Sequence, residues 1–311
     1  HQEARRQRQM CIRDRYGGVI PEIAARDHSV KIINILKTLL KKADKKLSDI
    51  NLVAYTAGPG LIGSLMVGET VAKTISNVLD IELLPINHLE GHILAPGLED
   101  DNLETPYLCL LVSGGHTQII ECSDYGSYKI LGETIDDACG EAFDKVGKLL
   151  NLDYPGGPKV SKLAAGGDPA RFNFPRALMK DRNLNFSFSG LKTAVLYALE
   201  DLEEKDYPDV AASFQEAVVD VLVKKLAYAI EQTGIKKLVC SGGVAANSLL
   251  RERLTDMGKT SELEVSYPKM EFCTDNAAMI AYAGFIRKKY NLKEYPTKFA
   301  RPRWPLGELY D

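Results

Sequence analysis

Residues 110–115 read LLVSGG, and residues 238–243 repeat the pattern as LVCSGG. In both segments an apolar run suited to a buried strand leads directly into Ser-Gly-Gly. Glycines at the end of a strand let backbone N–H groups approach a phosphate closely. One such turn is weak evidence, and two unrelated tight turns are the alternative. The repeat nevertheless predicts two strands of one domain that present their loops to a single nucleotide.

The segments around these turns alternate between helical and extended patterns. Apolar residues recur at helical spacing within 30–45, 64–79, 136–150, 208–233 and 274–290. Short apolar runs that favour strands occupy 50–56, 82–86, 107–112, 118–122 and 237–240. This order of strands and helices predicts an α/β layer architecture. Residues 155–158 read Pro-Gly-Gly-Pro, which predicts a tight loop and not a helix.

Length and composition limit the classes of protein that the chain can represent. Its 311 residues suggest two domains or one large domain. Hydrophobic residues make up 45% and charged residues 26%, which excludes collagen-like, coiled-coil and wholly disordered chains. No apolar run reaches the roughly 18–20 residues of a membrane span. With 39 basic and 42 acidic residues, the net charge of −3 argues against a surface coated in basic charge.

Cysteine usage and the chain start bear on the compartment. The six cysteines form no Cys-x-x-Cys pair and mostly lie in apolar runs, which is typical of reduced thiols in a cytosolic protein. The charged start is not followed by the apolar segment of a secretory signal. We therefore expect a cytoplasmic protein with no membrane partner.

Composition also indicates where domains begin and end. Residues 1–15 hold five arginines and almost no apolar residue, so we expect foreign sequence there, with a disordered basic tail as the alternative. The chain turns polar and acidic around 98–106, which predicts a domain boundary. We expect a first lobe at 16–105, with 291–311 as a candidate addition, and a second lobe at 106–290.

Two histidines are spaced for a shared metal ion. His88 and His92 are four residues apart, so on a helix they share one face, the arrangement that metal-binding helices use. A pair of capping or surface histidines is the alternative. Glu90 faces elsewhere on such a helix, so the segment is not the His-Glu-x-x-His motif of zinc peptidases. The candidate third ligand is Asp275, expected in the first turn of a helix, where carboxylates are favoured.

The histidine pair belongs to an ordered set of motifs. Residues 88–92 read HLEGH, which resembles the His-x-Glu-Gly-His signature of the TsaD (Gcp, Kae) family of tRNA threonylcarbamoyladenosine transferases. Further segments match in the family's order: YGGVIPE at 16–22, AGPGL at 57–61, LVSGGHT at 111–117, GEAFDK at 140–145, YPGGP at 154–158, FSFSGLKT at 186–193, GGVAAN at 242–247, CTDN at 273–276 and RPRWPL at 301–306. Single motifs are weak, but the ordered set is specific and covers about residues 16–311.

The resemblance implies a fold and a set of site residues. The fold is the actin/Hsp70/sugar-kinase (ASKHA) fold, with two ribonuclease-H-like lobes and a nucleotide cleft between them. The implied metal ligands are His88, His92 and Asp275. The implied adenylate-binding positions are Leu111, Val112, Ser113, Gly114, Gly115, Asp144, Gly157 and Asn247. Taken alone, Asp144 would be a surface carboxylate of a helix. Archaeal and eukaryotic relatives carry a tyrosine at the position of Leu111, so the chain resembles the bacterial or organellar branch.

The resemblance also implies a reaction. A metal-dependent acyltransferase of tRNA modification would move the threonylcarbamoyl group of threonylcarbamoyl-AMP to the N6 amine of the adenine at position 37 of tRNAs that read codons beginning with A, and release AMP. The ion would be divalent, with Fe(II) expected first and Zn(II) as the alternative. The implied partners are tRNA, a TsaB-like paralogous dimer partner and a TsaE-like small ATPase. Candidate contacts to tRNA phosphates are Arg171, Arg176, Lys180 and Arg182, with a solvated surface as an equal alternative.

Three other functions compete with this one. A metallopeptidase, as the family was once described under the name O-sialoglycoprotein endopeptidase, needs a glutamate that activates water, and Glu90 is predicted on the wrong helical face. A non-catalytic paralogue that serves as a partner protein typically lacks the histidine pair. A sugar kinase of the same fold leaves the histidine pair unexplained.

One family feature has no counterpart in the sequence. Family members begin with a strand and the motif Ile-Glu-Thr-Ser-Cys-Asp, and nothing in residues 1–15 resembles it. We therefore expect a truncated first lobe that lacks its N-terminal strands. Its unpaired strand edge would favour aggregation and lower the activity.

Overall fold

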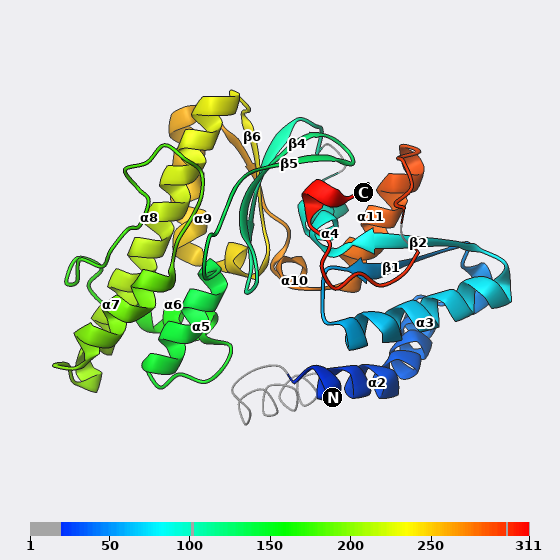
Figure 1. Cartoon of the computed structure of the whole chain (residues 1–311), viewed down its shortest axis with the longest axis horizontal. Helices are drawn as coiled ribbons and strands as arrows, with labels where there is room; N and C mark the ends of the chain where they lie inside the picture. The colour runs from blue at the N-terminus through cyan, green and yellow to red at the C-terminus, as the bar shows by residue number, and fades with distance from the viewer. Residues whose placement is uncertain (1–19, 101–102, 297, 311) are drawn as a thin grey trace. The chain divides into compact units, whose positions relative to one another are not determined.

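The computed structural model describes residues 20–100, 103–296 and 298–310, which form a mixed α/β chain (Figure 1). The expectations about residues 1–15 lie outside the described residues. The chain divides into two compact units, one formed by the described residues up to Leu98 and from Asn276 onward, the other by Glu99–Asp275. Within the described residues, no helix combines the length and the apolar character needed to cross a membrane.

The first unit is built on a two-stranded parallel sheet. β1 (Leu52–Gly58) and β2 (Glu82–Asn87) pair from Leu52↔Glu82 to Thr56↔Ile86. α3 (Ile62–Leu79) connects them, because parallel strands require a crossover. The other helices of this unit are α2 (Pro21–Lys42), η1 (Leu47–Asp49), α4 (His88–Leu94), η2 (Ala95–Leu98), α11 (Ala277–Lys289) and η5 (Leu306–Glu308).

Two glycines let α11 pack closely in this unit. A Cβ on Gly284 of α11 would meet the Cβ of Ala54 in β1 at 2.9 Å, and a Cβ on Gly91 of α4 would meet Cδ1 of Ile280 in α11 at the same distance. A larger residue at Gly284 would push α11 away from β1, and one at Gly91 would require the Ile280 side chain to shift. Consequently α4, which follows β2 directly, is held tightly against α11.

The second unit contains a five-stranded sheet in the order β5-β4-β3-β6-β7. Its strands are β3 (Tyr107–Val112), β4 (Thr117–Asp124), β5 (Ser127–Glu133), β6 (Lys237–Ser241) and β7 (Glu264–Ser266). β3 pairs antiparallel with β4 and parallel with β6. All six residues of β3 are buried, as expected for a central strand whose two faces are both covered.

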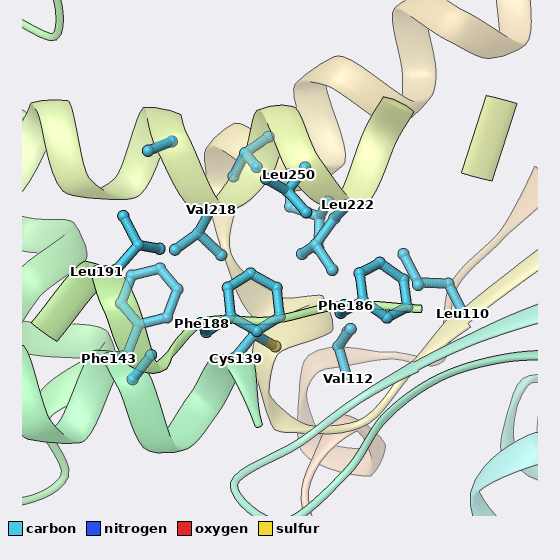
Figure 2. Close-up of a cluster of buried hydrophobic side chains, with 14 of the residues drawn as sticks. Leu110, Val112, Cys139, Phe143, Phe186, Phe188, Leu191, Val218, Leu222 and Leu250 are labelled. Atoms are coloured by element: carbon cyan, nitrogen blue, oxygen red, sulfur yellow. The ribbon is translucent and has the colours of Figure 1, made fainter. Parts of the chain in front are cut away.

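Helices supply the rest of the second unit's core. They are α5 (Cys139–Leu149), α6 (Gly156–Ala164), α7 (Ser189–Leu199), η3 (Glu204–Asp206), α8 (Tyr207–Thr233), η4 (Gly243–Ala246), α9 (Ser248–Ser261) and α10 (Met270–Cys273). Phe143, Phe186 and Phe188 meet Val218 and Leu222 of α8 in one buried cluster (Figure 2). This cluster anchors the loop before α7 and the start of α5 to the longest helix.

The prediction of a tight loop at 155–158 is wrong, because α6 begins at Gly156. Pro155 is the N-cap, and Pro158 falls within the first turn, where backbone N–H groups have no partner inside the helix. A proline there removes no hydrogen bond. The sequence pattern also gave no indication of β5, β7 or α7.

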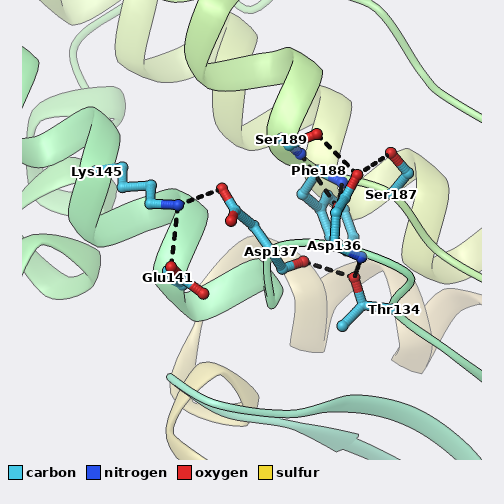
Figure 3. A network of polar contacts seen from close by, with 8 residues as sticks. All are labelled: Thr134, Asp136, Asp137, Glu141, Lys145, Ser187, Phe188 and Ser189. Carbon is cyan, nitrogen blue, oxygen red and sulfur yellow. Dashed lines mark hydrogen bonds and ion pairs between the residues drawn. The ribbon is translucent and has the colours of Figure 1, made fainter.

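A single carboxylate fixes the loop that precedes α7 (Figure 3). Asp136 accepts hydrogen bonds from Ser187 Oγ (2.6 Å), Ser189 Oγ (2.8 Å) and the backbone N–H of Phe188 (2.8 Å) and Ser189 (3.3 Å). Partial burial raises the pKa of the Asp136 carboxyl, but the four donors lower it by more, so the pKa lies below 3.8. The neighbouring Asp137 instead pairs with Lys145 of α5 at 2.6 Å.

We predict that Asp136→Asn lowers the free energy of unfolding by about 1–2 kcal/mol near neutral pH, because a charged acceptor of several hydrogen bonds is lost. The pKa is lower in the folded than in the unfolded state, where an aspartate titrates near 3.9. The wild-type advantage is therefore fully present above about pH 4 and is lost as the pH falls through the folded-state pKa. Urea unfolding of both proteins between pH 3 and 7 measures this. A difference that stays constant down to pH 3 would contradict the prediction.

Candidate functional site

The two Ser-Gly-Gly turns lie side by side because their strands are parallel neighbours. β3 pairs with β6 as far as Leu111↔Ser241, so the carboxyl ends of both strands lie at the same end of the sheet. Gly242 has a φ of 94°, and a Cβ there would meet the carbonyl oxygen of Val112 at 2.4 Å. A residue with a side chain does not fit this close approach. The second unit thus presents two adjacent glycine turns.

The first turn is held by its own serine. Ser113 Oγ accepts hydrogen bonds from the backbone N–H of Gly115 (3.3 Å) and of His116 (3.0 Å). Gly114 and Gly115 are exposed, and a Cβ on either would meet no other atom within 4 Å. Gly243 in the second turn is also exposed, and its nearest such contact is Thr274 Cγ2 at 4.0 Å. A ligand can therefore approach the backbone of both turns without displacing protein atoms.

Two of the implied adenylate positions meet where α5 packs on α6. The backbone N–H of Gly140, at the start of α5, donates to Ser113 O at 3.2 Å and so places α5 beside the first turn. Farther along α5, Asp144 Oδ1 accepts from the N–H of Gly156 at 2.8 Å, and the N–H of Gly157 also bonds this carboxylate. Burial raises the pKa of Asp144 by more than these bonds lower it. Asp144 is therefore a half-buried group that caps α6, and not an exposed carboxylate.

The side chain of Asn247 connects three helices of the second unit. Its Oδ1 caps α9 by accepting from the N–H of Leu250 (3.0 Å), and its Nδ2 donates to Ser161 Oγ (2.9 Å) and Gln215 Oε1 (2.8 Å). The side chain thus ties α9 to α6 and α8. A hydrogen bond from this amide to a ribose or base would have to replace one of these contacts.

Leu111 and Val112 take part only through their backbone. Both are fully buried in β3, and their side chains belong to the core. Their peptide groups lead directly to Ser113 and the two glycines, so these residues position the turn. The implied adenylate set therefore contains three kinds of residue: open glycines, a capping carboxylate and buried supports.

The helix with the two histidines begins where an asparagine caps it. Asn87 Oδ1 accepts from the N–H of Leu89 (2.9 Å), and its Nδ2 donates to Trp304 O at 2.9 Å. α4 therefore starts at His88, and the histidines occupy positions one turn apart. Their ring centroids are 4.8 Å apart with the planes at 87°.

Asp275 lies close to this pair. One ligand atom from each of His88, His92 and Asp275 can be chosen so that all lie within 4.8 Å of one another. Two ligands at the 2.0–2.2 Å typical of zinc span at most about 4.4 Å, so small side-chain adjustments would suffice for one ion. His92 is buried, His88 half-buried and Asp275 exposed. Two imidazoles and a carboxylate are a donor set that suits a divalent transition metal with coordination positions left open.

The position of Asp275 differs from the expected first helical turn. Asn276 is the N-cap of α11 and its side chain accepts from the N–H of Met279 at 2.9 Å, so Asp275 precedes the helix. The boundary between the two units falls between Asp275 and Asn276. Only the N-cap residue Asn276 therefore separates Asp275 from the helix against which α4 packs.

Sequence reasoning missed the groups that hold the histidine helix. Asn87 before a short helix is an N-cap signal that the sequence does carry. Glu90 is fully buried and pairs with Arg287 at 3.0 Å across 197 positions of sequence, and no local pattern announces such a pair.

Three arginines that were candidates for tRNA contacts are held in ion pairs. Arg171 pairs with Asp206 (2.7 Å) and Asp209 (2.6 Å). The pKa of Asp206 is lowered by the N–H of Glu203 and by Arg171, and that of Asp209 by Arg171 first. Arg176 pairs with Asp220 at 2.7 Å and Arg182 with Glu231 at 3.1 Å, both on α8. These contacts favour a role in fastening the 171–182 segment to α8.

Comparison with known families gives one match over most of the chain. The model described as TsaD, tRNA N6-adenosine threonylcarbamoyltransferase, matches residues 3–282. This range contains both glycine turns, the histidine pair and Asp275. It begins within residues 1–15, which we expected to be foreign sequence.

Two solved structures of HypF are similar in fold. Full-length HypF in a phosphate- and nucleotide-bound form has a TM-score of 0.60 and 15% identity over 83% of this chain and 41% of that one. HypF from T. kodakarensis has a TM-score of 0.61 and 17% identity over 80% and 42%. This chain therefore spans about two fifths of each HypF chain. The predicted α/β fold class is confirmed, and these neighbours fit the ASKHA fold.

For the histidine pair, we predict that His88→Ala/His92→Ala removes bound divalent metal and leaves the fold intact, because both side chains lie on one face of a short capped helix. Metal content of the purified protein and its thermal unfolding midpoint measure the two effects. His28→Ala, on the exposed surface of α2, is the matched control and should keep full metal content. Full occupancy in the double variant would contradict the site.

At the glycine turns, we predict that Gly242→Ala costs about 2 kcal/mol or more in the free energy of unfolding, since φ is positive and the Val112 carbonyl blocks the Cβ. Gly115→Ala should change it by no more than about 0.5–1 kcal/mol, because its Cβ meets open space. Urea denaturation of both variants tests the difference. Equal losses would show that the close approach at Gly242 is relaxed in solution.

Proposed function

Because the chain belongs to the TsaD family of tRNA N6-adenosine threonylcarbamoyltransferases, we propose that it transfers a threonylcarbamoyl group from threonylcarbamoyl-AMP to the N6 amine of adenine 37 in tRNAs that read codons beginning with A. AMP is the leaving group. The observation that carries the proposal is the family match over residues 3–282, which includes every residue of the candidate sites. The chain is then an acyltransferase of tRNA modification.

The glycine turns support the binding of an adenylate. Gly114, Gly115 and Gly243 are exposed on neighbouring turns, where backbone N–H groups can meet a phosphate. HypF has been solved with phosphate and nucleotide bound, which supports a nucleotide site in a fold of this kind. We assign Ser113 the task of holding the first turn, and Asp144 and Gly157 the task of bounding the site where α5 meets α6.

The proposed reaction forms a bond between the adenine N6 and the carbamoyl carbon and breaks the bond from that carbon to the AMP phosphate oxygen. The electron pair of the broken bond leaves with AMP, and the proton lost from N6 is taken up by the phosphate of the departing AMP or by water. His88, His92 and Asp275 would hold a divalent ion, Fe(II) first and Zn(II) as the alternative, which when bound supplies Lewis-acid polarisation of carbamoyl or phosphate oxygens. The chain's own turns orient the adenylate so that the acyl carbon faces the attacking amine.

The geometry does not favour a peptidase. Glu90 is fully buried, pairs with Arg287 and accepts a hydrogen bond from Tyr295 Oη, so its carboxylate is directed into the protein. A water-activating glutamate must instead reach the metal-bound water. A non-catalytic partner protein is disfavoured too, because the metal-ligand group is intact.

Further parts of the proposal follow the family. The substrate is tRNA, and the partners are a TsaB-like paralogue and a TsaE-like ATPase in the cytoplasm. Arg171, Arg176 and Arg182 form ion pairs with carboxylates of η3 and α8. We therefore expect the partner proteins to contribute to tRNA binding.

We expect Gly115→Val and Gly243→Val each to weaken the binding of a nonhydrolysable threonylcarbamoyl-AMP analogue at least tenfold, because the branched side chain would occupy the space that the ligand needs. Calorimetric titration measures the affinity. Gly68→Val on α3, where a Cβ also meets open space, is the matched control and should leave it unchanged. Unchanged affinity in both turn variants would place the adenylate elsewhere.

The activity itself is tested with the partner proteins, tRNA and labelled threonylcarbamoyl-AMP. Formation of the modified adenine with release of AMP is expected, and His88→Ala/His92→Ala should reduce its rate at least a hundredfold. Cleavage of a protein substrate without tRNA modification would overturn the proposal in favour of the peptidase.

A further inference from the structure

A buried polar network lies behind the histidine helix, on the side away from the metal ligands. Glu90 is fully buried, and its Oε1 accepts from Nη1 of Arg287 at 3.0 Å. Tyr295 Oη donates to the other carboxylate oxygen, and Arg287 Nη2 donates to Lys293 O. The Arg287 guanidinium also lies over the Tyr295 ring, 3.7 Å from its centroid. Three segments of the first unit therefore meet at one carboxylate: α4, α11 and the chain after α11.

The geometry of a helix explains why this carboxylate matters to the histidines. Successive residues are rotated by about 100°, so Glu90 projects roughly 200° from His88 and from His92. The ion pair therefore holds the face of α4 that lies opposite the two imidazoles. If α4 rolled about its axis, both imidazoles would swing together, and the ion pair resists that roll.

A second contact completes the restraint. Gly91 packs so closely on α11 that a Cβ there would meet Ile280 Cδ1 at 2.9 Å and Met279 Cγ at 3.2 Å. Met279 and Ile280 lie in the first turn of α11, next to Asp275 in sequence, whereas Arg287 lies near its other end. Two separated contacts, the close approach at Gly91 and the ion pair at Glu90, thus restrain α4 relative to α11.

Packing alone does not hold the arginine. Arg287 and Tyr295 form part of the wall of a cavity of about 400 Å³, together with Tyr55, Glu82 and Leu84. The guanidinium is only 5% exposed and lies against the Tyr295 ring, so its bonds to Glu90 and Lys293 act together with packing to determine where it lies. The network therefore holds its side chains in defined directions in addition to filling space.

We propose that Glu90, through Arg287 and Tyr295, is a positioning residue that sets the rotation of α4 so that His88 and His92 converge with Asp275 on one metal ion. The inference rests on the metal site of the proposed function and deepens it. Glu90 does not touch the metal or the substrate in this role. It acts through the helix backbone, in the manner by which outer groups orient ligands in metal sites generally.

The test separates positioning from stability by replacing Glu90, Arg287 and Tyr295 together with apolar groups of similar size. Removing one partner of a buried ion pair leaves an uncompensated charge, whereas replacing all partners is often neutral for stability. The triple variant Glu90→Met/Arg287→Met/Tyr295→Phe is therefore compared with wild type and with Glu90→Gln. Arg176→Met/Asp220→Met, which removes a partly exposed ion pair of the second unit, is the control for the loss of an ion pair elsewhere in the chain.

Co²⁺ alone is the probe, added to the purified full chain without substrate. Its affinity is measured by competition with a chelator, and its visible absorption bands report the coordination geometry. We expect the triple variant to unfold near the wild-type midpoint, to bind Co²⁺ at least tenfold more weakly and to shift the absorption bands, while the control variant matches wild type. Wild-type affinity and spectrum in the triple variant would overturn the proposal.

Two further outcomes are also decisive. If the triple variant does not fold, the Co²⁺ affinity and absorption bands of Glu90→Gln are measured instead. Affinity and bands unchanged from wild type in that variant would reject the proposal. If wild type binds Co²⁺ and the variants lose it, but no tRNA modification is detected with any protein, the positioning role stands and the proposed function fails.

Discussion

The parallel pairing of β3 with β6 is the constraint on which the second unit depends. Its register brings Ser241 beside Leu111, so the two glycine turns emerge at one sheet edge and touch where Gly242 passes the Val112 carbonyl. Burial of all of β3 makes this pairing costly to lose, because its backbone groups have no access to water. α5 then docks on the first turn through Gly140, and α6 follows through Asp144.

In the first unit, two of the three candidate metal ligands, His88 and His92, lie on the short helix α4. A seven-residue helix has little stability of its own, so its position must come from outside contacts. Asn87 caps it, Gly91 lets it approach α11, and Glu90 anchors its far face. The cap, the close approach and the ion pair use residues of α4 other than the two histidines.

The buried ion pair of Glu90 and Arg287 carries a desolvation cost that the orientation of the candidate metal ligands would have to justify. A buried ion pair contributes little net stability compared with apolar groups of the same volume. Its benefit is direction, since a carboxylate that receives bonds from Arg287 and Tyr295 accepts few alternative arrangements. The Asp136 network before α7 follows the same logic at the surface, where four donors converge on one carboxylate.

The sequence by itself determined many of the local elements and the candidate residues of the sites, but not β5, β7 or α7. The apolar run of β3, the Ser-Gly-Gly turns and the four-residue spacing of His88 and His92 are short-range patterns, and the strand and helix predicted from them formed. The loop predicted at 155–158 failed because proline is tolerated in a first helical turn. Only the tertiary structure decided that Asn247 braces three helices, that Asp144 caps α6 and that Glu90 meets Arg287. Such contacts join residues far apart in the chain, and no periodicity or spacing encodes which distant partner will complete a buried polar group.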